Sequence, residues 1–595
     1  MLNRTSDAGA FALSGADDVA LVPTPTPTTD ALPRRLADFE TLGQALDYAA
    51  TGVRGLNFFD ARARLVRVQP FSELKLDATR NAFRLIDAGI RPGDRVALIA
   101  ETSAEFVSLF FGCIYAGALP VPLPLPTSFG GREGYVEQIR SQLMSCDPSL
   151  TLAPSGLSAI VTESANGLRC KVAVDWLDFM ARKAPEAILP KAKSDDIAYL
   201  QYSSGSTRFP HGVEITHEAL LANLNGHAVG VHLGDDDRVI SWLPYYHDMG
   251  LVGCLMAPVA NQVSADYLAT EDFARRPLSW LALITRNEGH SLSYSPTFGY
   301  DICARRVSSQ TDVAERFDLS RWRIAGNGAD MIRPDVMQAF TDAFAAAGFS
   351  AKSFTPSYGL AEATLAVTIA PPGTGIIVDM VDERLLSGDE DAAGTEGRMR
   401  AIVNCGVALP NMSIEIRDEA GALLPDRAIG KVFVAGPSIM TGYFRDDLST
   451  RAALNGRWLD TGDMGYMLGG ALYIVGRAKD MIIINGKNHW PQDIEWAIEQ
   501  LPGFKAGDIA AFSITTPQGE EAPAVLVQCR TTDMDERARL REAIKAKVRA
   551  ITGMNCIVEL VPPRTLPRTS SGNLSRSKAR ALYLSGQIQP FDIAA

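Results

Sequence analysis

From residue 42 onward, segments with the pattern of buried strands alternate with segments that have the pattern of helices. Strands are expected at residues 95–100, 197–202 and 239–243, and helices at residues 104–116 and 278–286. Such alternation is typical of α/β proteins, in which helices cover a largely parallel sheet. The sequence therefore predicts an α/β fold built of layered sheets and helices.

The chain divides into a tail and two domains of unequal size. Residues 1–33 contain alternating proline and threonine and no apolar period, so we expect a disordered tail. Residues 34–478 form a large N-terminal domain, in which an acidic segment at about residues 375–400 is either an insertion or a solvated surface loop. Residues 479–595 mix charged helices with alternating strands and predict a small α+β C-terminal domain.

The charge and the cysteine content of the chain limit which partners and which cellular compartment are expected. The 595 residues include 57 Lys and Arg against 69 Asp and Glu, and this net charge of −12 disfavours a nucleic-acid partner. The eight cysteines are scattered without a CxxC pair, as in a reduced, cytoplasmic protein. An uncharged stretch at residues 106–131 is broken by four prolines, so no transmembrane segment is expected.

A loop rich in hydroxyl groups follows the expected strand at residues 197–202. It can surround phosphate oxygens with side-chain and main-chain donors from Ser203, Ser204, Gly205, Ser206 and Thr207. The spacing differs from GxxxxGK[ST], which excludes the standard P-loop. Taken alone, the stretch fits an ordinary surface loop at least as well.

Six further motifs follow this loop in order. They are WLPYYHDMGL at residues 242–251, GNGA at 326–329, YGLAE at 358–362, DTGD at 460–463, GRAKD at 476–480 and PRTSSGN at 567–573. The ordered set resembles the adenylate-forming superfamily of acyl-CoA synthetases, nonribosomal peptide adenylation domains and luciferases. The resemblance covers about residues 40–585 and implies a large AMP-binding domain followed by a small mobile domain.

Three details are similar to one branch of that superfamily, the fatty acyl-AMP ligases. The loop reads GSTR-x-P at residues 205–210, LPYYHDMGL occupies residues 243–251, and NCGVALP at residues 404–410 follows the acidic segment. The resemblance implies that ATP and Mg²⁺ activate a medium- or long-chain fatty acid as acyl-AMP. It also implies transfer to the phosphopantetheine of an acyl carrier protein or a polyketide synthase carrier domain. An insertion matching the acidic segment would restrain the small domain and disfavour coenzyme A as acceptor.

The resemblance also assigns the nucleotide site. The hydroxyl-rich loop, with Arg208 as an added cation, would bind the β- and γ-phosphates, and Glu362 would bind Mg²⁺. Asp463 and Arg477 would hold the ribose. The adenine site, with Tyr358 stacked on the base, would consist of Asn327, Gly328, Ala329, Tyr358 and Gly359.

Three residues are implied to act in catalysis. His247 would lie near the acyl carboxylate, and Lys479 would be the pivot of the small domain between two poses. Asn573 stands where the family has a lysine directed at the carboxylate and the α-phosphate. Because Asn carries no charge, either Arg576 or Lys578 substitutes, or adenylation is slow or lost.

A fatty chain requires a long apolar slot. Ordinary core packing explains its expected lining equally well, and that lining is Met249, Gly250, Leu251, Val252, Phe298 and Tyr300. The sequence leaves chain length, carrier and oligomeric state open. Two alternative functions also stay open: a long-chain fatty acyl-CoA synthetase, and a homologue that binds acyl-adenylate without turnover. Only Asn573 supports the second alternative.

Overall fold

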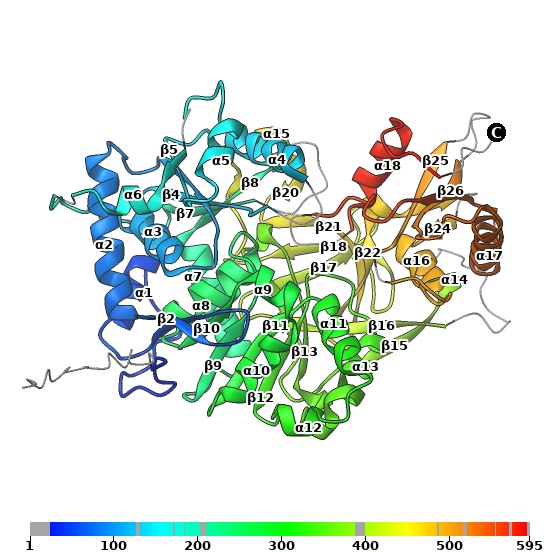
Figure 1. Ribbon diagram of the computed structural model, residues 1–595, viewed down its shortest axis with the longest axis horizontal. Coiled ribbons are helices and arrows are strands. Elements are labelled where there is room, and N and C mark those ends of the chain that lie inside the picture. The colour runs from blue at the N-terminus through cyan, green and yellow to red at the C-terminus, as the bar shows by residue number, and fades with distance from the viewer. Residues whose placement is uncertain are drawn as a thin grey trace, which may run out of the picture.

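The computed structural model of the chain shows a large domain and, at the right of Figure 1 in orange to red, a small C-terminal domain. The residues that the structure describes are 24–126, 131–170, 173–183, 185–202, 210–386, 399–484, 487–505, 507–515, 521–553, 555–569 and 574–591.

One long mixed sheet runs through the large domain. Six of its strands are parallel: β13 (Phe354–Gly359), β12 (Trp322–Asn327), β11 (His290–Ser295), β9 (Asp237–Ser241), β10 (Ala265–Leu268) and β1 (Gly55–Phe59). The antiparallel β2 (Leu65–Pro70) closes that edge. The other end is antiparallel and follows the order β17 (Ser413–Arg417), β18 (Gly430–Ala435), β21 (Trp458–Leu468), β22 (Ala471–Arg477), β16 (Met399–Ala408) and β14 (Ala366–Ile369). Off this path, β15 (Val378–Asp382) pairs with β16, and β20 (Leu454–Asn455) pairs with β21.

Two smaller sheets and a set of helices complete the large domain. A parallel sheet has the order β4 (Leu119–Leu123), β3 (Arg95–Ile99), β5 (Leu150–Ala153) and β6 (Ala173–Asp175), and an antiparallel sheet has the order β19 (Gly442–Tyr443), β8 (Gly212–Thr216) and β7 (Ile197–Tyr202). The helices are α1 (Leu42–Ala49), α2 (Phe71–Asp87), α3 (Ala104–Tyr115), α4 (Gly131–Cys146), α5 (Ser158–Ser164), α6 (Trp176–Met180), α7 (His217–Gly230), a π-helix (Met249–Met256), α8 (Ala257–Ala260), α9 (Thr270–Arg275), α10 (Leu278–Arg286), α11 (Thr297–Val307), α12 (Val313–Arg316), α13 (Pro334–Phe344), α14 (Glu383–Leu386) and α15 (Asp447–Ala453).

The predicted α/β organisation is confirmed, and its elements follow from local chemistry. β3 is buried along its whole length, as expected for a parallel strand covered on both faces. α3 begins after Ser103, whose side chain accepts a hydrogen bond from the Phe106 amide at 3.3 Å, and ends at Tyr115. The uncharged stretch then continues into β4. None of the helices in the described ranges is long and apolar enough to cross a bilayer.

The small domain has a core of its own. Its elements are β23 (Ile482–Ile484), β24 (Lys487–His489), α16 (Pro491–Glu499), β25 (Ile509–Thr515), β26 (Glu521–Gln528), α17 (Met534–Thr552), β27 (Ile557–Val561) and α18 (Arg576–Leu584). Its apolar clusters begin at Ile482, whereas the main cluster of the large domain ends at Leu472. The two domains meet along α16, where Asp493 forms an ion pair of 3.0 Å with the buried Arg400 of β16.

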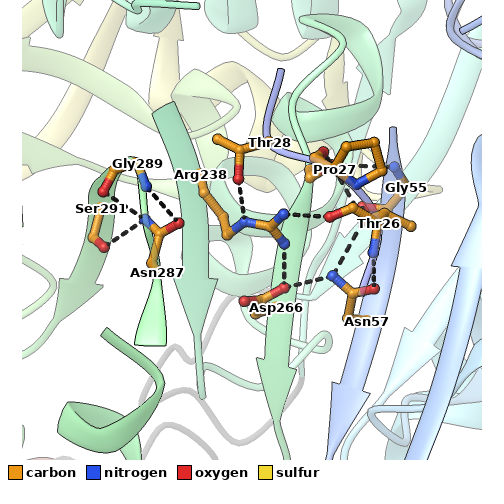
Figure 2. Close-up of polar contacts among 11 residues, drawn as sticks. Thr26, Pro27, Thr28, Gly55, Asn57, Arg238, Asp266, Asn287, Gly289 and Ser291 are labelled. Atoms are coloured by element: carbon orange, nitrogen blue, oxygen red, sulfur yellow. Dashed lines mark hydrogen bonds and ion pairs between the residues drawn. The ribbon is translucent and has the colours of Figure 1, made fainter. Parts of the chain in front are cut away.

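The segment that precedes α1 is packed against the large sheet. Thr26 is buried, and its main-chain amide donates a hydrogen bond to the Asn57 side chain of β1 at 2.9 Å (Figure 2). Arg238 of β9 donates to the Thr26 carbonyl and to the Thr28 hydroxyl, and it forms a buried ion pair with Asp266 of β10. Residues 26–28 of the predicted tail over residues 1–33 thus lie against the sheet, held by polar contacts that an apolar pattern does not reveal. Residues 1–23 lie outside the described ranges.

Candidate active site

A buried carboxylate, a tyrosine hydroxyl and a guanidinium meet at the junction of β13, β21 and β22. Asp463 and Arg477 are cross-strand partners in the β21–β22 register, and Arg477 Nε lies 3.4 Å from Asp463 Oδ1. The Tyr358 hydroxyl donates a hydrogen bond to Asp463 Oδ2 at 2.7 Å. Burial raises the pKa of the Asp463 carboxyl, and the charge of Arg477 and the hydrogen bond from Tyr358 only partly offset it. Three sequence-predicted nucleotide residues are thus brought together.

The ends of β12 and β13 carry the residues predicted to form the adenine site. The Asn327 side chain is fully buried, and its amide donates to the Ser295 carbonyl at 3.2 Å while its Oδ1 has no hydrogen-bond partner in the described structure. Ala329 has a left-handed φ of 66°, which is uncommon for a residue other than glycine and is typical of functional turns. At Gly359 a Cβ would lie 1.8 Å from the Leu365 carbonyl oxygen, so this turn requires glycine.

Glu362 follows in the next turn, on a short 3₁₀ helix. Its carboxylate Oε1 accepts a hydrogen bond of 3.0 Å from the Tyr443 hydroxyl. Burial raises the pKa of Glu362, while the bond from Tyr443 and the charge of Arg477 act in the opposite direction. The Glu362 main chain is held as well, because its carbonyl accepts a hydrogen bond of 2.9 Å from the Met440 amide.

His247 lies on the loop between β9 and the π-helix, paired with the next residue. Its Nδ1 is 2.7 Å from Asp248 Oδ1, and both side chains are largely buried. Burial opposes the ionisation of His247, but the charge and hydrogen bond of Asp248 outweigh this effect and raise the pKa of the imidazole. π-Helices are rare and often occur at functional sites. Here the turn requires Gly250, because a Cβ would lie 2.2 Å from the Pro244 carbonyl oxygen.

The expected acyl-lining residues fall into two environments. Met249, Leu251 and Val252 are buried on the π-helix, and the partly buried Phe298 at the start of α11 meets the Trp242 ring edge-on at 5.7 Å. Tyr300 is different, because its hydroxyl donates to the Gly326 carbonyl at 2.8 Å and its ring packs in an aromatic cluster. Those contacts are typical of a core residue.

Two of the predicted functional segments lie outside the described residues. They are the hydroxyl-rich loop (Ser203, Ser204, Gly205, Ser206, Thr207 and Arg208) and Asn573. The strands that flank the loop, β7 and β8, pair up to Tyr202 and Gly212, so the two ends of the loop are held together. Lys479 follows β22, and its pKa is lowered by partial loss of hydration and by the neighbouring Arg477.

Arg576 and Lys578 are the two cations considered as substitutes for the lysine that is missing at position 573. Arg576 Nε and Nη2 each lie 2.7 Å from a carboxylate oxygen of Glu495, and Nη1 lies 3.3 Å from Asp480. Its charge therefore anchors α18 to α16 and to the residue after Lys479. Lys578 is exposed.

Three side chains that hold these residues in place were not predicted from the sequence. Asp248 pairs with His247, and Tyr443 bonds Glu362. Asp330 accepts hydrogen bonds from the Thr297 amide and hydroxyl, at 3.0 and 2.9 Å, and so ties the turn after β12 to α11. Asp248 could have been suspected from its place beside His247, whereas the other two contacts join segments far apart in the sequence.

Comparison with known proteins places the chain in a family. The family model of AMP-binding enzymes matches residues 65–444. A Caulobacter vibrioides protein named as an acyl-CoA synthetase is 46% identical over 567 residues, which cover 94% of this chain and 98% of that protein. The medium-chain-fatty-acid–[acyl-carrier-protein] ligase JamA of Moorena producens is 29% identical, with 93% and 97% covered.

A solved structure from a study of fatty acyl-adenylate ligases of E. coli and L. pneumophila is 44% identical, with a TM-score of 0.89. The match covers 93% of this chain and 100% of that chain. The ordered motifs, the fold and these matches agree, and the chain belongs to the AMP-binding enzymes of the adenylate-forming superfamily.

Proposed function

We propose that this AMP-binding enzyme is a fatty acyl-AMP ligase, which activates a medium- or long-chain fatty acid with ATP and passes the acyl group to a carrier protein. The observation that carries the proposal is the convergence of Tyr358, Asp463 and Arg477 at one site, with Glu362 in the turn that follows β13. The similarity to fatty acyl-adenylate ligases over the whole length of that chain supports the choice of substrate class. The name of JamA supports a carrier protein as acceptor.

In the adenylation step, a fatty carboxylate oxygen attacks the α-phosphorus of ATP, and the bond to the pyrophosphate oxygen breaks. Both reactants are anions, so the site must bring them together against their repulsion. Asp463 would accept hydrogen bonds from the ribose hydroxyls and fix the nucleotide, and the unpartnered Oδ1 of the buried Asn327 would accept one from the adenine amino group. His247, held by Asp248, would donate to the fatty carboxylate.

Glu362 has the chemistry that a magnesium site requires. Its carboxylate is a hard oxygen donor, and one of its oxygens is already oriented by Tyr443. When bound there together with ATP, Mg²⁺ would neutralise phosphate charge. The ribose residues and the hydroxyl-rich loop would supply the remaining contacts to the nucleotide.

The acidic segment favours a carrier protein over free coenzyme A. Its first part, β15, pairs with β16, and α14 follows directly. The Leu386 carbonyl at the end of α14 accepts a hydrogen bond of 3.3 Å from the Trp490 indole, which belongs to the small domain. We expect this contact to restrain the second pose of that domain. A cytoplasmic location is also proposed, supported by eight cysteines that form no disulfide.

The test is a product analysis with ATP, Mg²⁺ and fatty acids of graded chain length, in which acyl-AMP, acyl-CoA and acyl-carrier protein are measured separately. We expect acyl-AMP to form, the acyl group to be transferred to phosphopantetheinylated carrier protein, and little acyl-CoA to be produced. Efficient acyl-CoA formation by the intact protein would instead favour a fatty acyl-CoA synthetase, the function in the name of the Caulobacter vibrioides relative. Absence of fatty-acid-dependent pyrophosphate exchange would favour a binding protein without turnover.

A further inference from the structure

Residues 440–444 connect the turn of Glu362 to the strand that follows the hydroxyl-rich loop. On one side, the Met440 amide donates to the Glu362 carbonyl at 2.9 Å, and the Tyr443 hydroxyl donates to the Glu362 carboxylate at 3.0 Å. This short segment therefore holds both the main chain and the side chain of Glu362.

On its other side, the same segment pairs with β8. Gly442 and Tyr443 of β19 are in register with Glu214 and Val213, and the Phe444 amide donates to the Gly212 carbonyl at 2.7 Å. Gly212 also closes the β7–β8 ladder, so it marks the end of the hydroxyl-rich loop. Tyr443 thus stands between Glu362 and the point where that loop re-enters the sheet.

A second contact fixes the ring of Tyr443. The His211 ring lies 4.9 Å from it, centroid to centroid, and His211 Nδ1 is 3.0 Å from Asp446 Oδ2. Asp446 in turn caps α15 through the Ser449 amide. Loop end, tyrosine ring and helix cap form one packed unit, so the Tyr443 hydroxyl has little freedom to follow Glu362 if the carboxylate rotates.

The hydrogen-bond geometry assigns different roles to the two oxygens of Glu362. Among the described residues, Tyr443 is the side-chain hydrogen-bond donor to this carboxylate, and it occupies Oε1. A carboxylate turns readily about its last torsion, and a partly buried one without a donor loses hydration with no compensation. One hydrogen bond from the fixed Tyr443 hydroxyl limits the rotation of the carboxylate and compensates for its lost hydration. It leaves Oε2 for a cation.

We infer that Tyr443 is a positioning residue for the Mg²⁺–ATP complex. It sets the orientation of the Glu362 carboxylate relative to the end of the hydroxyl-rich loop. The inference rests on the proposed function for the identity of the nucleotide. It gives Tyr443 no direct contact with ATP or with the fatty acid.

The test is Tyr443→Phe in the full-length protein, with Tyr115→Phe as the matched control. Tyr115 also donates to a carboxylate, Asp47 Oδ1 at 2.9 Å, but it lies on α3. We expect Tyr443→Phe to raise the Mg²⁺ concentration for half-maximal acyl-AMP formation about tenfold, equivalent to about 1.4 kcal/mol, with a rate within about threefold of wild type at saturating Mg²⁺. Tyr115→Phe should change neither quantity.

A direct metal measurement separates this inference from the proposed function. Binding of Mn²⁺ to the protein–ATP complex, followed by electron paramagnetic resonance, should weaken about tenfold in Tyr443→Phe. This readout requires no turnover, so it decides the role of Tyr443 even if no fatty acid is adenylated. If acyl-AMP forms normally and Mn²⁺ affinity is the same in Tyr443→Phe and wild type, the inference alone is overturned.

The variant Glu362→Asp tests whether Tyr443 acts through Glu362. The shorter side chain keeps the charge but withdraws it from the hydroxyl, so Mn²⁺ binding should weaken to a similar degree. Adding Tyr443→Phe to Glu362→Asp should then cost nothing further. Additive losses would refute positioning and indicate a separate structural role, and melting temperatures of all variants would identify any that fold poorly.

Discussion

Asp463→Asn should weaken ATP binding without destabilising the protein. In the structure Asp463 is buried, accepts a hydrogen bond from Tyr358 at 2.7 Å and lies 3.4 Å from Arg477. Asn has nearly the same shape and can still accept from Tyr358, but its amide nitrogen cannot accept from Arg477, so the substitution removes the charge and the contact with Arg477. The expected result is a loss of binding to the ribose, where the charge is needed.

The magnitudes follow from these contacts. A hydrogen bond to a charged acceptor contributes about 1.5–3 kcal/mol, and Asn retains part of two such bonds, so a net loss of about 3 kcal/mol corresponds to a roughly 100-fold increase in the ATP dissociation constant. The free energy of unfolding, in contrast, should not decrease in this variant. Because the pKa of Asp463 is raised on folding, its ionisation costs folding free energy as the pH rises above the ordinary carboxyl range. At neutral pH the Asn variant escapes that cost, and Arg477 remains hydrated because about half of its side chain is exposed, at 55%.

Asp379→Asn is the matched control. Asp379 also accepts a tyrosine hydroxyl, Tyr466 at 2.9 Å, and also pairs with an arginine, Arg427 at 2.9 Å, but it lies on β15. Calorimetric titration with a non-hydrolysable ATP analogue should show the loss only in Asp463→Asn, and thermal melting should show no loss of stability for that variant. Unchanged nucleotide affinity in Asp463→Asn, or equal losses in both variants, would refute the assignment of Asp463 to the ribose.

Two substitutions test other parts of the site. Gly250→Ala should lower the single-turnover rate of acyl-AMP formation about 100-fold, because the Cβ would lie 2.2 Å from the Pro244 carbonyl oxygen and would displace the start of the π-helix; an unchanged rate would show that this turn is not part of the acyl site. Asn573→Lys should raise the same rate at least about tenfold, equivalent to about 1.4 kcal/mol, because Arg576 is engaged with Glu495 and does not supply the missing charge. An unchanged rate in Asn573→Lys would show that another cation already supplies the positive charge.

Local pattern was sufficient for most regular elements. α10 has the bounds expected from the sequence, and β7 also spans the residues where a strand was expected. These elements are decided by burial of one stripe or one strand, which the sequence displays directly. The contacts of the N-terminal segment could not be predicted in this way, because Thr26 is held by Asn57 and Arg238, residues 31 and 212 positions away in the chain. No periodicity in the segment itself records such partners.

The residues of the candidate site also fall into a group that the sequence could predict and a group that it could not. The residues proposed to touch the nucleotide, such as Asp463 and Arg477, lie in motifs whose order resembles a known superfamily, so they were predictable. The residues that hold them, Tyr443 and Asp330, were not. Tyr443 is 81 positions from Glu362, and its only local context is an edge strand of two residues.

The surroundings of Arg576 show why a departure from a family motif has to be judged in three dimensions. From the sequence, a cation three residues after Asn573 is an obvious substitute for the missing lysine. In the structure its guanidinium is already neutralised by Glu495 and Asp480, and breaking such a pair costs about 3–5 kcal/mol. Moving Arg576 toward the α-phosphate would therefore cost about as much as the roughly 3–4 kcal/mol that one preorganised donor typically contributes to a transition state, which leaves little or no net gain. We therefore expect the positive charge at this site to come from other residues, and Arg477, Lys479 and Arg208 are the candidates that the motifs supply.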